Sequence, residues 1–203
     1  KFFGRGIITG FARINGYSVG ILANDSNFYA GSMSADGAKK TARFVRTCDT
    51  FNIPIVSLVD EPGFLIGPEA ESQATILYGT EAVLAVTEST VPWSTVMIRK
   101  SFGVAAAAHY GPDGYVLAWP SAESGPLPLE GGVAVAFKKE IESAKDPEAK
   151  RKEIEQKMSK NQNPFPRAES FSVHEIIDPR KTRFYLSNWA ERIQPQMKAK
   201  LFK

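Results

Sequence analysis

The sequence predicts an α/β fold in which a mostly parallel β-sheet is covered by helices. Short β-rich runs alternate with helix-like segments along most of the chain, an order typical of parallel sheets. A strong turn signal near the N-terminus adds an antiparallel hairpin. The chain has 203 residues, 43% hydrophobic and 23% charged, and is therefore long enough to bury a core of this kind.

The hairpin is the most strongly marked element. Residues Ile7 to Ile14 and Tyr17 to Ala23 alternate in polarity and favour strands. Between them lies Asn15-Gly16, a dipeptide that tolerates the two positive φ angles of a type I′ turn. We therefore expect two antiparallel strands joined by this turn.

A helix and a buried strand are expected next. Ser34 can cap a helix that runs to about Phe51, with apolar residues at intervals of three and four. The only cysteine, Cys48, lies in this helix and is expected to pack as a small apolar residue. Residues Ile53 to Val59 form a short apolar run, which is typical of a strand buried on both faces.

The middle of the chain continues the alternation. A helix is expected at Glu69 to Thr87, and strands are expected at Val91 to Ile98 and at Gly114 to Trp119. A segment of small residues runs from Ser101 to Tyr110, and a loop rich in proline, glycine and serine runs from Pro120 to Gly131. This order predicts strands that pair in parallel.

The C-terminal third is predicted to be helical. One helix is expected at Val133 to Glu142, and a polar helix at Glu148 to Lys160 has Asp146 as its N-cap. Residues Asn163 to Pro166 break the pattern, and a last helix is expected at Lys181 to Ile193. Three of its apolar side chains are available for docking on the rest of the fold: Phe184, Leu186 and Trp189.

Composition excludes several classes of function. The formal net charge is only +3, and no basic run is interleaved with stacking aromatics, so nucleic-acid binding is not expected. No apolar run is long enough to span a bilayer, and the first residues lack a signal-peptide pattern. Because strand-like sequence begins almost at Lys1, we expect a piece of a longer polypeptide. A single cysteine favours an intracellular compartment.

Side chains that could catalyse a reaction are few. His109 and His174 are far apart and lack a metal-ligand spacing, and we interpret His109 as a polar helix residue. The sequence has no G-x-S-x-G, P-loop or G-x-G-x-x-G motif. The acidic pair Asp60-Glu61 follows a buried strand, where α/β folds place ligand-contacting groups. Capping of the following turn explains the pair equally well.

Two backbone features are the stronger candidates. The glycines of Pro62 to Gly67 allow a sharp turn and a close approach to a ligand. In Lys100 to Ala108, a predicted strand runs into a helix of small side chains that begins near Gly103. The free N–H groups at such a helix start stabilise an oxyanion. Close helix packing that requires small residues is the alternative, and the pattern alone leaves both open.

At these residues the chain resembles the carboxyltransferase subunits of biotin-dependent acyl-CoA carboxylases of the propionyl-CoA carboxylase beta type, and the related sodium-pumping decarboxylases. Several motifs in the same order make the resemblance specific, and it covers nearly the whole chain. It concerns the C-terminal half of the family's subunit. The matching stretches are Gly10–Gly16, Lys40–Pro54, Val59–Gly67, Arg99–Gly103, Ala118–Glu123, Asn163–Phe165 and Ile176–Arg183.

The resemblance implies a crotonase-like spiral of β-sheet with flanking helices. It implies that residues 1–203 form one C-terminal carboxyltransferase domain, in which residues 145–203 are a helical extension that packs on the domain or on a partner subunit. The implied compartment is the cytoplasm, or the mitochondrial matrix in a eukaryote.

The implied activity moves a carboxyl group from carboxybiotin to the α-carbon of an acyl-CoA, with backbone oxyanion holes at a dimer interface. Biotin would be carried by a separate carrier protein or domain, and the chain itself would bind no metal. The implied partners are the acyl-CoA substrate, the biotin carboxyl carrier and biotin carboxylase components, and the N-terminal half of a partner subunit. The assembly would be a homo-oligomer built from dimers, commonly a hexamer.

The resemblance also assigns site residues. The catalytic segment would be Gly103, Val104 and Ala105, in which the last two donate N–H groups to the ureido oxygen. Val104 stands where the family has a second glycine and would crowd the approach, and Ala107 falls where the family selects its acyl chain. The expected biotin-binding residues are Asp60, Pro62, Gly63, Phe64, Gly67, Ala106 and Ala107.

Other functions remain open at this point. One is a biotin-dependent acyl-CoA decarboxylase subunit, which runs the reverse step. Another is a different crotonase-type CoA-ester enzyme, such as a hydratase, which would need positioned carboxylates from Asp60, Glu61, Glu69 or Glu71. The last is a non-catalytic scaffold subunit, which the replacement of a glycine by Val104 permits.

Overall fold

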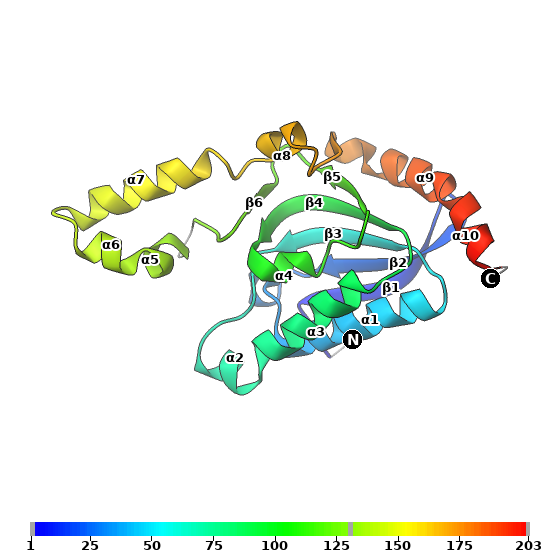
Figure 1. Ribbon diagram of the computed structural model, residues 1–203, viewed down its shortest axis with the longest axis horizontal. Helices are drawn as coiled ribbons and strands as arrows, with labels where there is room; N and C mark the ends of the chain where they lie inside the picture. Colours follow the sequence, from blue (N-terminus) through cyan, green and yellow to red (C-terminus); the bar gives the residue numbers. More distant parts are fainter. Residues whose placement is uncertain (1–2, 130–131, 202–203) are drawn as a thin grey trace.

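One mixed sheet forms the centre of the molecule, with helices on both faces and a helical arm that extends from one side (Figure 1). The computed structural model describes residues 3–129 and 132–201. The path of the sheet is β1-β2-β3-β4-β5-β7, and β6 pairs with β4 beside this path. The predicted class, a mostly parallel sheet covered by helices, is confirmed.

The predicted hairpin is confirmed. Strands β1 (Ile7–Ile14) and β2 (Tyr17–Asn24) pair antiparallel with Ile14 opposite Tyr17. Asn15 and Gly16 have φ angles of 50° and 83°, both positive as a type I′ turn requires.

All the other pairings are parallel. The first half of β4 pairs with β5 and its second half pairs with β6, so β4 bridges two neighbours on one side. Two of these strands were not predicted, because two or three residues carry no readable alternation. The bounds are β3 (Ile55–Glu61), β4 (Trp93–Phe102), β5 (Tyr115–Ala118), β6 (Glu123–Gly125) and β7 (Glu175–Ile176).

Helices α1 (Ala35–Thr50) and α3 (Thr75–Thr87) cover one face of the sheet. Ser34 caps α1 as expected, because its Oγ accepts the N–H of Gly37 at 3.1 Å. Cys48 is buried in this core, and burial together with the neighbouring Asp49 raises the pKa of its thiol to about 12. The thiol therefore packs as an apolar group.

The expected single helix from Glu69 to Thr87 is wrong. A short helix α2 (Pro68–Ser72) precedes α3, and Ala74 between them has a φ angle of 57°. A left-handed residue cannot continue a right-handed helix, so the chain changes direction there. Apolar residues recur at helical spacing on both sides of Ala74, so the sequence does not reveal this break.

Helix α9 (Thr182–Arg192) covers the opposite face of the sheet (Figure 1). Leu186 and Trp189 are buried against strand residues of a second core, as expected from their spacing. The third residue that was available for docking, Phe184, is 61% exposed and does not pack in this core. Helix α10 (Gln194–Leu201) continues the chain beyond α9 and was not predicted.

The arm consists of α5 (Gly132–Ala136), α6 (Lys138–Glu142) and α7 (Pro147–Ser159) (Figure 1). The single helix expected at Val133 to Glu142 is divided at Phe137, whose ψ of 20° departs from helical geometry. The predicted cap of α7 is confirmed, because Oδ1 of Asp146 accepts the N–H groups of Glu148 and Ala149.

The remaining helices are short. They include α4, which begins where the chain turns at Gly103, and a helix in the stretch that was expected only to break the helical pattern. Their bounds are α4 (Gly103–Ala107), α8 (Phe165–Glu169), and the 3₁₀ turns η1 (Tyr29–Gly31) and η2 (Pro179–Lys181). Among the described residues, no helix has both the length and the apolar character that a membrane crossing requires.

Two substitutions in α9 test how this helix is held. Trp189→Ala is expected to lower the free energy of unfolding by about 3–5 kcal/mol, because it leaves a large cavity in the second core. Phe184→Ala in the same helix is the matched control and should change it by no more than about 0.5 kcal/mol. Urea unfolding measures both, and equal effects would contradict the packing.

Candidate functional site

Two loops leave the same edge of the sheet. Strand β3 ends in the glycine-containing loop from Pro62 to Gly67, and its parallel neighbour β4 runs directly into α4. The carboxyl ends of adjacent parallel strands meet at one edge, which is where α/β folds build ligand sites. The two backbone features expected from the sequence are therefore brought together.

Asp60 fills an irregularity between these strands. Val59 pairs with Met97, but Glu61 pairs with Ser101, so β4 advances four residues while β3 advances two. The Oδ1 atom of Asp60 accepts the backbone N–H of Lys100 at 3.1 Å, and its two oxygens bind the Arg99 guanidinium at 2.8–3.1 Å. The Asp60 side chain thus takes the place of a backbone acceptor that regular strand pairing would supply, and it fixes how β4 leads into α4.

The loop after β3 is tied to the segment before α1. The N–H of Met33 donates to the carbonyl oxygen of Gly63 at 3.0 Å, and the N–H of Leu65 donates to the carbonyl oxygen of Met33 at 2.9 Å. Gly63 and Gly67 have φ angles of 136° and 107°, which side chains other than glycine rarely adopt. Glycine is therefore required at both positions.

The Phe64 ring faces the core. A Cβ atom added to Gly79 of α3 would lie 2.4 Å from this ring, so the ring sits directly on the helix backbone. Phe64 is half-buried and packs with the core between the sheet and α3. The Phe64 ring therefore holds the loop in position from the side of the core.

The donor turn begins at Gly103, whose φ angle of 63° lets the chain swing from β4 into α4. The first N–H groups of a helix have no intrahelical acceptor. Val104, the second residue of α4, is 68% exposed, whereas Ala105 has no exposed surface. Of the two residues expected to act as donors, Val104 is the one exposed at the surface of this chain.

The other expected biotin-binding residues differ in how exposed they are. Asp60, Pro62, Gly63 and Gly67 are half-buried at the ends of β3 and the following loop. On α4, Ala107 is exposed and Ala106 is buried.

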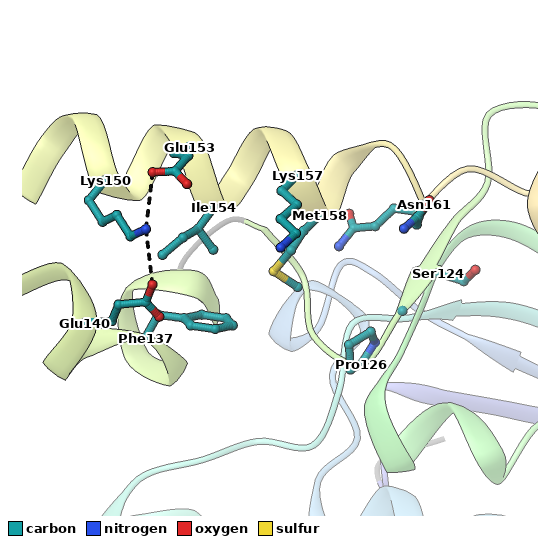
Figure 2. A pocket seen from close by; sticks show the side chains of 12 residues that line it. Ser124, Pro126, Phe137, Glu140, Lys150, Glu153, Ile154, Lys157, Met158 and Asn161 are labelled. Carbon is teal, nitrogen blue, oxygen red and sulfur yellow. Dashed lines mark hydrogen bonds and ion pairs between the residues drawn. The ribbon is translucent and has the colours of Figure 1, made fainter.

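A cavity of about 420 Å³ lies between β6 and the arm (Figure 2). Phe137, Ile154 and Met158 contribute apolar surface, and Lys150 is held between Glu140 and Glu153 at its far end. This cavity was not predicted from the sequence, because its walls come from segments that are in places more than thirty residues apart.

This cavity adjoins the donor turn. Pro126, one of its lining residues, has its carbonyl oxygen 3.4 Å from the position that a Cβ on Gly103 would occupy. Pro126 thus connects the cavity to the turn, although no residue of α4 lines the cavity.

The interpretation of His109 as a polar helix residue is wrong, because its side chain has no exposed surface. It lies near Glu61, which is equally buried and whose Oε1 accepts the N–H of Gly63 at 3.0 Å. Turn capping therefore explains Glu61. No group of three or more histidine, cysteine or acidic side chains in the described part of the chain could hold a metal ion.

Comparison with known proteins identifies the family. A model of the carboxyl transferase domain matches residues 1–201. The chain is 41% identical over 186 residues to the carboxyltransferase subunit of propionyl-CoA carboxylase from Haloferax mediterranei, and 41% identical to the alpha subunit of methylmalonyl-CoA decarboxylase from Propionigenium modestum. Each match covers 89% of this chain and 36% of the relative, so the chain spans little more than a third of their length.

Solved structures give the same result for the fold. The transcarboxylase 12S hexamer with bound methylmalonyl-coenzyme A superposes with a TM-score of 0.83 at 40% identity, covering 93% of this chain and 37% of that one. The beta subunit of geranyl-CoA carboxylase from P. aeruginosa superposes with a TM-score of 0.83 at 26% identity, covering 92% and 36%. The expected crotonase-like fold with flanking helices is thereby confirmed.

Removal of Asp60 tests its role in the site. Asp60→Ala is expected to lower the free energy of unfolding by about 1.5–3 kcal/mol, because hydrogen bonds to a charged acceptor are worth this much. Arg99→Ala, which leaves the bond to the Lys100 amide intact, should cost less than about 1 kcal/mol. Chemical unfolding distinguishes the two, and a larger loss from Arg99→Ala would refute the ladder role.

Proposed function

This chain belongs to the carboxyl transferase domain family, and we propose that it supplies the biotin-side part of a site that moves a carboxyl group from carboxybiotin to the α-carbon of an acyl-CoA. The relatives support this proposal, because their names describe carboxylation or carboxyl transfer of propionyl-CoA and methylmalonyl-CoA. The observation that carries it is the position of Val104, an exposed residue in the first turn of α4, where backbone N–H groups have no intrahelical acceptor.

The residues present fit a cyclic urea. Its oxygen needs an N–H donor that is not already bonded, and the first turn of α4 provides one at Val104. Gly103 has no side chain to block the approach, and Gly103, Val104 and Ala107 are all exposed. When bound, carboxybiotin would supply the carboxyl group while negative charge develops on its ureido oxygen.

The contribution of the chain to catalysis is then electrostatic. A preorganised backbone donor is worth about 3–4 kcal/mol of transition-state stabilisation in other oxyanion holes. The bond of Asp60 to Lys100 and the packing of Phe64 on Gly79 hold the two loops in place before any ligand arrives. This preorganisation is what gives such a donor its value.

The carboxylates argue against a hydratase. Asp60 is tied up by Arg99 and the Lys100 amide, and Glu61 has no exposed surface. Glu69 and Glu71 are exposed on α2. General acid–base catalysis requires a carboxyl group within reach of the reacting atoms, and none of these four is free and accessible beside the donor turn.

Decarboxylation is the second candidate, supported by the similarity to the methylmalonyl-CoA decarboxylase subunit. The same donor would serve both directions, because a transition state is shared by the forward and reverse steps. Carboxyl transfer is preferred here because several relatives of comparable identity are named for carboxylation or carboxyl transfer, against one decarboxylase among them.

The other half of the site would come from a partner subunit. Ile76, Leu77 and Leu84 of α3 are 49–62% exposed, and Ile66 of the preceding loop is 80% exposed. Helix α3 contacts α4, so this apolar surface lies close to the donor turn. Large exposed apolar side chains gathered on one helix indicate an interface, and we assign this one to the acyl-CoA-binding half of a partner, in an oligomer built from dimers.

Val104→Pro tests the donor directly. Proline is tolerated in the first turn of a helix but has no N–H, so the variant should keep the fold and lose the donor. In the assembled enzyme we expect carboxyl transfer to fall by about 10²–10³-fold. In the ¹⁵N-labelled chain, we expect the shifts of the neighbouring amides caused by biotin to be lost.

Val104→Ala is the matched control, because it shortens the side chain and keeps the N–H. It should retain carboxyl transfer and biotin binding. Full turnover by Val104→Pro would exclude this amide as the donor and favour the scaffold alternative.

Leu77→Glu tests the interface. A buried, unpaired carboxylate is costly, so the variant should dissociate the assembled enzyme into smaller species, as measured by light scattering after size-exclusion chromatography. Thr50→Glu places the same charge on an exposed residue of α1 and should leave the assembly intact. Unchanged assembly with Leu77→Glu would place the interface elsewhere.

A further inference from the structure

Two ionisable side chains without any exposed surface face each other between α4 and the sheet. Glu61 is the last residue of β3, and His109 lies two residues beyond the end of α4. Nε2 of His109 is 3.7 Å from Oε2 of Glu61. Neither side chain has a part in the proposed transfer of the carboxyl group.

Glu61 connects three segments of the chain. Its Oε1 atom accepts the N–H of Gly63 at 3.0 Å and that of Met33 at 3.3 Å. Its Oε2 atom accepts from Nδ2 of Asn24 at 3.0 Å. A carboxylate is buried at acceptable cost only when donors surround it, and here the donors come from the end of β2, the segment before α1 and the loop after β3.

His109 connects α4 to the sheet. Its Nδ1 atom is 2.9 Å from the Ser57 hydroxyl, and its carbonyl oxygen accepts from the Thr95 hydroxyl at 2.8 Å. Nε2 has no hydrogen-bond partner among the described residues, and the group it faces is the Glu61 carboxylate. At 3.7 Å the contact is longer than a hydrogen bond, but close enough for an electrostatic attraction.

Ser57, His109 and Glu61 are the residue types of a hydrolytic triad, but this cluster cannot act as one. All three side chains are fully buried, and Ser57 lies within β3 where no substrate carbonyl can reach it. A nucleophile must be within bonding distance of its substrate. The cluster therefore acts within the protein.

We propose that Glu61 and His109 are positioning residues, whose contact holds α4 against the loop from Pro62 to Gly67 and so fixes the direction of the Val104 amide. Helix α4 has only five residues and His109 follows two residues after its end, so a movement of His109 is passed on to the helix that carries Val104. The effect on biotin rests on the proposed function, whereas the effect on α4 does not.

Two substitutions at His109 test the roles of its two ring nitrogens separately. His109→Gln places an amide nitrogen near the position of Nε2 and keeps a donor toward Glu61. His109→Asn places its amide near Nδ1, so it keeps a partner for Ser57 and removes the donor toward Glu61. The first is expected to rescue what the second loses. Ser57→Ala is a further control, because it leaves the contact of Nε2 with Glu61 unchanged.

The ¹⁵N-labelled chain is examined by hydrogen exchange and by titration with biotin. Exchange of the Ala108 and His109 amides reports the opening of α4, since they donate to Ala105 and Ala106. In His109→Asn we expect about tenfold faster exchange and about tenfold weaker biotin binding. In His109→Gln and Ser57→Ala both quantities should stay within about twofold of the unsubstituted chain.

Equal behaviour of His109→Asn and His109→Gln, whether both intact or both impaired, would overturn the proposal. If His109→Asn fails to fold, Glu61→Gln replaces it. That variant keeps the size and one acceptor oxygen and removes the charge, and unchanged exchange and binding would again overturn the proposal. If the unsubstituted chain does not bind biotin but the exchange rates differ as expected, the positioning role stands and the proposed function fails.

Discussion

The parallel pairing of β3 with β4 is the constraint on which the site depends. It brings the loop after Glu61 and the turn at Gly103 to the same edge of the sheet. The pairing is irregular near that edge, and Asp60 closes the irregularity by accepting the amide of Lys100. This bond fixes the backbone of β4 at Lys100, three residues before α4 begins.

The charged side chains around the site bind neighbouring segments of the chain and hold them in place. Asp60 is bound to Arg99, and Glu61 is surrounded by donors from three segments. The exposed residues at the turn are Gly103, Val104 and Ala107, which carry no polar side chain, and the positive φ of Gly103 makes the turn possible. This division suits a reaction in which a cofactor supplies the reactive group and the protein supplies orientation and electrostatic stabilisation. For such a reaction, rigid support of a backbone amide contributes more to catalysis than an additional acidic or basic side chain.

The surface suggests that the chain works within an assembly. Apolar side chains of α3 are exposed close to the donor turn, and the arm of α5, α6 and α7 extends from the sheet with a cavity at its base (Figure 1). In α7, Ile154 is the one buried residue among those described. A polar arm with so little buried surface gains little stability from its own domain, since stability scales with the apolar area removed from water.

The sequence by itself determined the elements whose signals are local. Asn15-Gly16 predicted the hairpin, Ser34 and Asp146 predicted helix starts, and the ordered motifs predicted the family, because each depends only on neighbours along the chain. Tertiary structure decided the rest. Ala74 breaks a helix whose periodicity continues across it, Phe184 faces away from the core beside a buried Trp189, and β6 and β7 exist only because longer strands accept them.

The site shows the same division. The sequence indicated the turn at Gly103, because a glycine followed by a run of small residues after a predicted strand is a local pattern. That Val104 is exposed while Ala105 is sealed depends on how α4 lies on the sheet. The meeting of Glu61 with His109 joins residues 48 positions apart, and no local pattern encodes such a distance. Burial, which gives both side chains their significance, is a property of the folded chain alone.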